Sequence, residues 1–201
     1  MPEIGKEVGK ERILGGLLKT GQTTSYNSYA DDGYYEKGLS KQYTILTAGQ
    51  YDGTTSITLN LKTDVHSNNC VYDRRTKLTW SRYISASLGP ASNGKLPWTT
   101  NASGEGIFAY CAAANVAKLA GYSDWRIPNI FELFSLSDLG KNPPFPDSIA
   151  FPSWGTDDRT YSSTTAPNNT LNGITLNFNI ASVSSNVKTT SNYYCILVRG
   201  G

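Results

Sequence analysis

Few side chains in this 201-residue sequence have a type and spacing suited to catalysis. It contains three cysteines, Cys70, Cys111 and Cys195, and one histidine, His66. Their spacing matches neither a zinc-ligand pattern nor a disulfide framework, so we expect no metal site and no cofactor. A lone histidine gives no Ser-His-Asp arrangement, and no glycine-rich phosphate loop is present. We therefore expect no catalytic residue and a protein that is not an enzyme.

The C-terminal part of the chain has a composition suited to recognition. From Tyr161 onward there is no acidic residue, only Lys188 and Arg199 are charged, and Asn, Ser, Thr and Tyr dominate. Tyrosine buries area at low entropic cost and small polar groups adapt their hydrogen bonds, as in antibody binding surfaces. Alternatively, these residues are the solvated loops and strand faces of a small sandwich. The candidate ligand contacts, polar or aromatic residues in loops or on outward strand faces, are Asn168, Asn169, Asn172, Asn177, Asn179, Asn186, Asn192 and Tyr193.

Two strands are expected to carry this region. Residues 173–180 alternate between apolar and polar side chains, which predicts a strand with one buried face. Residues 193–199 are largely apolar, so we expect a closing strand at the centre of its sheet. The first strand is expected to bury Ile174, Leu176, Phe178 and Ile180 and to expose Thr175, Asn177 and Asn179.

Other segments predict the remaining scaffold. Residues 55–61 alternate as a strand, and residues 70–73 and 78–84 flank a turn, which predicts a hairpin. Residues 107–120 have the spacing of an amphipathic main helix. Its apolar stripe is expected to contain Phe108, Cys111, Ala112, Val116 and Leu119. In the polar loop before it, we expect the Trp98 ring to pin the loop to the body rather than to form an exposed stacking platform.

Residues 121–136 are expected to organise the fold. Gly121 can adopt the left-handed conformation that ends a helix, and Asn129 with Glu132 three residues later predicts a capping box for a short second helix. Between them, Trp125 is expected to be buried under the turn, with its two charged neighbours bonding nearby backbone or each other. We interpret this stretch as a structural hub rather than a ligand site.

These motifs resemble the signature of the Lcl_C family, which is grouped with C-type lectin-like folds. Residues 121–128 read Gly-Tyr-Ser-Asp-Trp-Arg-Ile-Pro, and Glu-Leu-Phe-Ser-Leu follows at 132–136. Further similar segments, in the expected order, are residues 19–24, 31–33, 73–80, 161–164 and 195–199. The resemblance implies an α+β, loop-rich, C-type lectin-like fold in which two main helices pack on short antiparallel sheets. It implies one domain over residues 19–201. Before it, residues 1–18 mix charged residues with scattered Ile, Val and Leu, and we interpret them as an arm.

The resemblance also implies roles for several residues. Family members often carry a cysteine in the long helix and another in the last strand, so a bridge or a close thiol pair between Cys111 and Cys195 is implied, although spacing leaves the connectivity open. Tyr161 and Arg199 match motif positions and are expected to be scaffold. The calcium motifs of carbohydrate-binding C-type lectins are absent and the tail has no carboxylate, so we expect no calcium-dependent sugar binding. The nearest carboxylates, Asp157 and Asp158, suit only a structural site.

Some proteins of this kind are the variable proteins of diversity-generating retroelements, whose diversified codons often read Asn, Tyr, Ser or Thr. This chain is similar to such a protein, which implies a viral receptor-binding or cell-surface protein that displays its tail to a protein or glycan ligand. The alternatives are a non-diversified adhesin or structural virion component, and an enzyme of the formylglycine-generating type. The last alternative requires active-site cysteines, whereas Cys111 and Cys195 are expected on a helix stripe and an apolar strand.

Charge and hydropathy restrict the partners. The net charge is +2 with 17% charged residues, which gives no basic field for nucleic acid. No apolar run reaches the roughly 20 residues that span a bilayer, so we expect no membrane insertion. The N-terminus lacks the apolar core of a signal peptide, so we expect a virion or cell-surface location reached by another route, such as assembly into a particle. The arm over residues 1–18 is the candidate contact for an assembly partner.

Overall fold

The computed structural model describes the C-terminal half of the chain almost continuously and the N-terminal half in separate segments. The described residues are 17–26, 31–36, 38–46, 70–82, 95–99, 104–116, 118–143, 146–152, 159–190 and 193–201. The strand expected at 55–61, residues 1–16 of the expected arm, His66, Asp157 and Asp158 therefore lie outside them.

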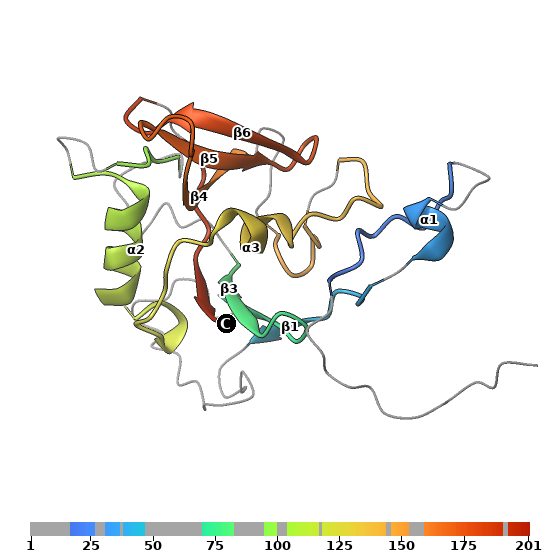
Figure 1. Cartoon of the computed structure of the whole chain (residues 1–201). Coiled ribbons are helices and arrows are strands. Elements are labelled where there is room, and N and C mark those ends of the chain that lie inside the picture. Colours follow the sequence, from blue (N-terminus) through green and yellow to red (C-terminus); the bar gives the residue numbers. More distant parts are fainter. Residues whose placement is uncertain are drawn as a thin grey trace, which may run out of the picture.

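The described part is a mixed α+β structure, as expected, and it has the loop-rich character of C-type lectin-like folds (Figure 1). Its helical elements are α1 (Asp32–Tyr35), α2 (Ile107–Val116), the 3-10 turn η1 (Leu119–Gly121) and α3 (Ile130–Phe134). Its strands form one four-stranded and one three-stranded antiparallel sheet. Figure 1 shows the three-stranded sheet at the top of the molecule, above α3 and the four-stranded sheet.

The four-stranded sheet contains the predicted hairpin. Its order is β1 (Tyr43–Leu46), β2 (Cys70–Asp73), β3 (Leu78–Ser81) and β7 (Val198–Gly200). Asp73 fixes the turn between β2 and β3, because its carboxylate accepts hydrogen bonds from Arg75 N (2.8 Å) and Thr76 Oγ1 (2.8 Å). The hairpin prediction is thus confirmed.

The closing strand differs from the prediction. Residues 195–198 are buried, but β7 comprises only Val198–Gly200 and lies at the end of the sheet order, not at its centre. Upstream, Tyr194 bridges Thr160 of the other sheet, and Arg126 pairs with Val198 through both backbone groups (2.8 and 2.9 Å). The segment passes from one sheet to the other, so neither sheet can hold all of it as a central strand.

The three-stranded sheet has the order β4 (Arg159–Thr165), β5 (Asn172–Asn177) and β6 (Ser182–Val187). The predicted alternation holds for Leu176 and Phe178, which are fully buried, but not for Ile180, which is 69% exposed in the turn after β5. Ile174 is half-buried, and Thr175, expected to face solvent, is fully buried. β5 is the middle strand, with β4 and β6 on its two edges, and Thr175 is buried opposite Tyr161, which is also fully buried.

The main helix also differs from the prediction. It ends at Val116 instead of residue 120, and Gly121, with its predicted positive φ of 87°, closes the following 3-10 turn. The helix buries Ile107, Tyr110, Cys111 and Ala114, whereas Phe108, Ala112 and Val116 of the predicted stripe are exposed. Both stripes have helical spacing, but the core packs against the one with Ile107, Tyr110 and Ala114. Phe108 instead packs edge-on against Trp98 of the neighbouring loop, with ring centroids 4.7 Å apart.

The hydrophobic core consists of two clusters on opposite faces of the four-stranded sheet. Successive residues of β2, Cys70 and Val71, point into different clusters, as strand geometry requires. The first cluster contains the buried side of α2 and Trp125, and the second contains Leu133 of α3 and Phe178. Helices α2 and α3 therefore cover opposite faces of the four-stranded sheet, and the second cluster joins α3 to residues of the three-stranded sheet and its turn.

Candidate ligand-binding surface

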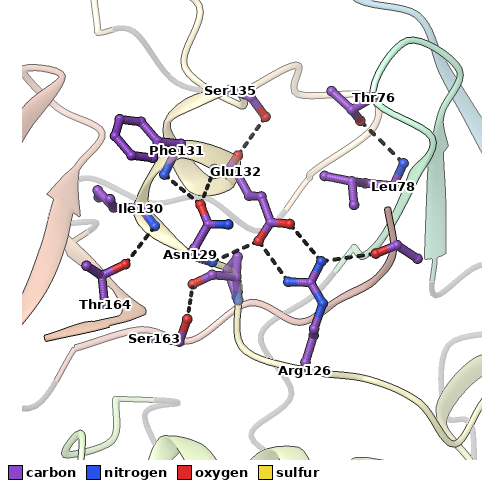
Figure 2. A network of polar contacts seen from close by, with 12 residues as sticks. Thr76, Leu78, Arg126, Asn129, Ile130, Phe131, Glu132, Ser135, Ser163 and Thr164 are labelled. Carbon is purple, nitrogen blue, oxygen red and sulfur yellow. Dashed lines mark hydrogen bonds and ion pairs between the residues drawn. The ribbon is translucent and has the colours of Figure 1, made fainter. Parts of the chain in front are cut away.

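The capping box at the start of α3 forms as predicted (Figure 2). Asn129 Oδ1 accepts hydrogen bonds from the N–H groups of Phe131 and Glu132 (both 2.9 Å), and Glu132 accepts one from Asn129 N (2.8 Å). The Arg126 guanidinium donates to both carboxylate oxygens of Glu132 (2.8 and 2.7 Å). Burial alone would raise the pKa of Glu132, but the bonds from Arg126 and Asn129 outweigh it and lower that pKa.

Trp125 is buried under the turn, as predicted, and its indole donates to Leu119 O (2.9 Å). Its charged neighbours do not bond to each other, but Arg126 Nη2 donates to the backbone carbonyl of Gly200 (3.0 Å), which is the other expected arrangement. Arg126 pairs with Glu132, and Asp124 accepts from Arg199 Nε (2.7 Å). These bonds use both charged groups to hold the C-terminal strand and α3, so the stretch is a structural hub.

The hub also positions the three-stranded sheet. The backbone N–H of Ile130 donates to Thr164 Oγ1 (3.1 Å), and that of Ser163 donates to Pro128 O (2.8 Å). Figure 2 shows Thr164 and Ser163 of β4 directed toward the start of α3. A rigid element therefore supports the base of the sheet that carries the predicted contacts.

Three of the predicted contact residues lie together at the end of the sheet where β4 turns into β5. Asn168 and Asn169 are exposed in that turn, and Asn169 Oδ1 accepts from Leu171 N (3.1 Å). Asn172 follows at the start of β5, where its backbone N–H donates to Asn169 O (2.9 Å) and its amide to Ser185 Oγ (2.9 Å). The turn is thus ordered by its own hydrogen bonds and leaves the Asn168 side chain in solvent.

Lys188 and Trp98 brace this end of the sheet. The Lys188 ammonium donates to Thr165 Oγ1 (2.8 Å) and Thr170 O (2.9 Å) and lies 4.0 Å from the centroid of the Trp98 ring. The indole N–H of Trp98 donates to Ser162 O (2.9 Å). As predicted, Trp98 pins its loop to the body of the protein.

The other predicted contacts lie elsewhere. Asn177 and Asn179 are at the opposite end of the β5–β6 hairpin. Asn177 is five residues, or roughly 17 Å, along the strand from Asn172, and Asn179 lies in the turn that follows. Asn186 and Tyr193 are half-buried and bonded to each other, with Tyr193 Oη donating to Asn186 Oδ1 (3.1 Å). The Asn186 amide in turn donates to Thr175 Oγ1 (2.8 Å). The eighth residue, Asn192, lies outside the described residues.

The structure adds neighbours that the sequence did not suggest. Leu171 is 72% exposed beside Asn169, and Val187 pairs with Asn172 across the hairpin and also reaches solvent. The sequence at 182–187, Ser-Val-Ser-Ser-Asn-Val, alternates too weakly to reveal its outer face. We name the resulting cluster the hairpin surface; it consists of Asn168, Asn169, Leu171, Asn172, Ser185 and Val187.

The three cysteines are buried and form no disulfide. Cys111 and Cys195 lie in the same hydrophobic cluster, without the bridge that was one of the two expected arrangements. The Cys111 thiol donates to Trp125 O (3.1 Å), and burial raises its pKa to about 11. Burial, and after it the proximity of Cys111, raises the pKa of Cys195. Both thiols are therefore protonated at neutral pH.

Two further properties concern the described part of the chain only. Nowhere in it do three or more His, Cys, Asp or Glu side chains gather in an arrangement that could hold a metal ion. Its helices are all too short or too polar to cross a membrane.

Comparison with known protein families gives a match. The family model described as the Lcl C-terminal domain matches residues 69–199, which span both sheets from β2 onward, α2, the hub and α3. No curated protein and no solved structure matches the chain.

Proposed function

The chain belongs to the Lcl C-terminal domain family, and we propose that it is a non-catalytic, adhesin-type module that binds its ligand through the hairpin surface. The family membership and the α+β fold support a C-type lectin-like scaffold.

The observation that carries the proposal is the composition of the hairpin surface on a braced support. Exposed asparagines stand beside two exposed aliphatic side chains, Leu171 and Val187, and no acidic residue occurs from Tyr161 onward. A surface that mixes adaptable hydrogen-bonding groups with apolar area is typical of protein recognition sites. Lys188 and Trp98 hold its backbone in place, so little ordering entropy is lost on binding.

The same surface favours a protein ligand over a glycan. Its six residues include no aromatic side chain on which a sugar ring could stack, and Tyr193, the aromatic candidate, is half-buried and bonded to Asn186. Recognition would therefore depend on amide hydrogen bonds and on contact with Leu171 and Val187. A glycan ligand is the alternative that the binding assay distinguishes.

The proposal is tested by screening the intact chain against arrayed surface proteins and arrayed glycans and then comparing two variants on the ligand found. Asn169→Ala combined with Leu171→Ser should weaken binding at least tenfold. The matched control, Asn179→Ala combined with Ile180→Ser, changes an amide and an exposed aliphatic residue at the other end of the hairpin and should change binding less than twofold. Equal loss in both variants, or in neither, would refute the hairpin surface as the binding site.

We also propose that the chain is the variable protein of a diversity-generating retroelement, on a virion or cell surface. The support is the family resemblance and the Asn-rich tail, together with the position of Asn168, whose exposed side chain can change without disturbing the core. Sequencing the 3′ end of the gene across a source population tests this. Substitutions concentrated between Asn168 and Tyr193, with residues 121–136 constant, are the expected result. An invariant tail would instead indicate a non-diversified adhesin or a structural virion component.

An enzyme of the formylglycine-generating type is disfavoured by the state of the thiols. Such chemistry needs an accessible, activated cysteine, whereas burial raises the pKa of both Cys111 and Cys195. This state of the thiols favours a binding module over an enzyme.

A further inference from the structure

A cavity of about 420 Å³ lies between the first described residues of the chain, the segment before β1, and α3. Small-molecule sites in proteins usually have volumes of roughly 300–1,000 Å³, with apolar walls and a few convergent polar groups. The residues that line this cavity are Leu17, Leu18, Lys19, Thr20, Lys41, Thr76, Phe131, Phe134, Ser135, Ser137 and Leu139. None of them belongs to the hairpin surface, so the cavity is independent of the proposed function.

The walls of the cavity are apolar and open to solvent. Phe131 and Phe134 are three residues apart and share one side of α3, while Leu133 on the other side is buried in the core. Phe131 is 85% exposed, and Leu17 across the cavity is 90% exposed. Several large apolar side chains exposed around one hollow usually mark a binding site, because leaving them in water is unfavourable.

One cationic side chain of the cavity wall, Lys41, has an incomplete set of hydrogen-bond and ion-pair partners. The Lys41 ammonium donates to the backbone carbonyl of Ser137, and none of the described carboxylates lies at ion-pair distance from it. The acids whose field reaches it are engaged elsewhere: Asp138 pairs with Lys141 (3.2 Å), and Asp73 fixes the β2–β3 turn. Desolvation lowers the pKa of Lys41 to about 8, although both acids oppose that shift.

A second polar group near Lys41 also lacks a partner. Ser137, whose carbonyl receives the Lys41 bond, lines the cavity and is only 4% exposed, and its hydroxyl has no hydrogen-bond partner in the described part of the chain. A buried hydroxyl without a partner is unfavourable, and an acceptor on a ligand would satisfy it. The cavity thus combines apolar walls with a cation and a spare donor.

We propose that this cavity binds a small amphiphilic monocarboxylate, such as a medium-chain fatty acid. The alkyl chain would lie against Leu17, Phe131 and Phe134, and the carboxylate would accept hydrogen bonds from Lys41. An ion pair in this partly desolvated place is stronger than one on the open surface, and it supplies the partner that Lys41 lacks. The other lysine of the wall, Lys19, is already paired with Glu36 (3.3 Å).

The test is calorimetric titration of the full chain with octanoate, octanol and octylammonium, which share a chain length and differ in head-group charge. Octanoate should bind one to one, octanol at least tenfold more weakly, and octylammonium not measurably. Lys41→Met should weaken octanoate binding at least tenfold, whereas the matched control Lys95→Met, which removes a lysine outside the cavity wall, should leave it within twofold.

A pH series on the unmodified chain keeps the test decisive if Lys41→Met fails to fold. The charged groups that face Lys41 are Asp138, Asp73 and Lys141. Because Lys41 loses its charge above about pH 8, octanoate affinity should fall between pH 7 and 9.5 while octanol affinity stays constant. Equal affinity for octanoate and octanol, or no saturable binding, would overturn the proposal. Self-association of the unmodified chain that Phe131→Ser abolishes would also overturn the proposal, because the cavity would then be an interface between copies of this chain.

Discussion

Replacing Glu132 with alanine should destabilise the protein far more than removal of an ordinary surface carboxylate. The change removes the acceptor for Asn129 N, and loss of a helix cap costs about 1 kcal/mol. It also removes both bonds to Arg126. Charge-assisted bonds are worth about 1.5–3 kcal/mol when buried, but the Arg126 side chain is 43% exposed, so we discount this pair to about 1 kcal/mol. The expected total is about 2 kcal/mol.

Calorimetry or urea denaturation followed by circular dichroism measures this loss. For a chain of 201 residues, 1 kcal/mol lowers Tm by roughly 2–4 °C, so Glu132→Ala should lower it by roughly 4–8 °C. Glu36→Ala is the matched control, because it breaks an exposed pair with Lys19 and should cost below about 0.5 kcal/mol. A double-mutant cycle between Glu132→Ala and Arg126→Met should give a coupling of about 1 kcal/mol. Equal effects of the Glu132 and Glu36 substitutions would refute the reasoning.

The same residue predicts a pH dependence. The pKa of Glu132 in the folded protein lies below that of an unfolded glutamate, about 4.3, so its stabilisation is fully present above that pH. The stabilisation is lost as the pH falls through the lower, folded pKa. The stability difference between the unmodified protein and Glu132→Gln should therefore be constant from pH 5 to 7 and shrink below about pH 4. A difference that does not change down to pH 3 would contradict the assigned ion pair.

Three further predictions follow from packing and burial. A Cβ at Gly173 would lie 2.7 Å from Cδ1 of Trp98, so Gly173→Ala should lower the free energy of unfolding by about 1–3 kcal/mol and shift the tryptophan emission. Unfolding monitored by fluorescence measures both effects, and unchanged emission and stability would contradict this packing. Phe178→Ala should cost about 3–5 kcal/mol, whereas Ile180→Ala should cost below about 0.5 kcal/mol; similar midpoints in urea would show that the two residues are equally buried. Cys111 is buried and burial raises its pKa to about 11, so it should resist iodoacetamide at pH 7.5 until urea unfolds the protein. Mass spectrometry detects the labelling, and rapid labelling of the native chain would contradict this prediction.

The features predicted correctly from the sequence depend on residues close together in the chain. Asn129 and Glu132 cap α3, and Asp73 closes the β2–β3 turn, because each bond joins residues at most three positions apart. Burial of Trp125 and the position of α3 follow from the same short stretch. Composition alone also identified the acid-free tail, since that property does not depend on folding.

The features that sequence reasoning missed depend on contacts between distant segments. The buried side of α2 packs in one core cluster with residues of distant segments, such as Leu46 and Leu197. The closing segment is divided between two sheets by its pairings with Thr160 and Trp80. Strand β1 was not predicted, because its partner, β2, begins more than twenty residues further along.

The candidate sites show the same division. The sequence by itself determined which side chains suit recognition, because a side chain's hydrogen-bonding capacity and charge are local properties. Only the tertiary structure decided which of them lie together: the hairpin register separates Asn177 from Asn172, and folding brings Lys41 beside Ser137, almost a hundred residues away. Bringing such distant segments together costs conformational entropy, which only the packing of the assembled core offsets. No local sequence pattern can therefore indicate these contacts.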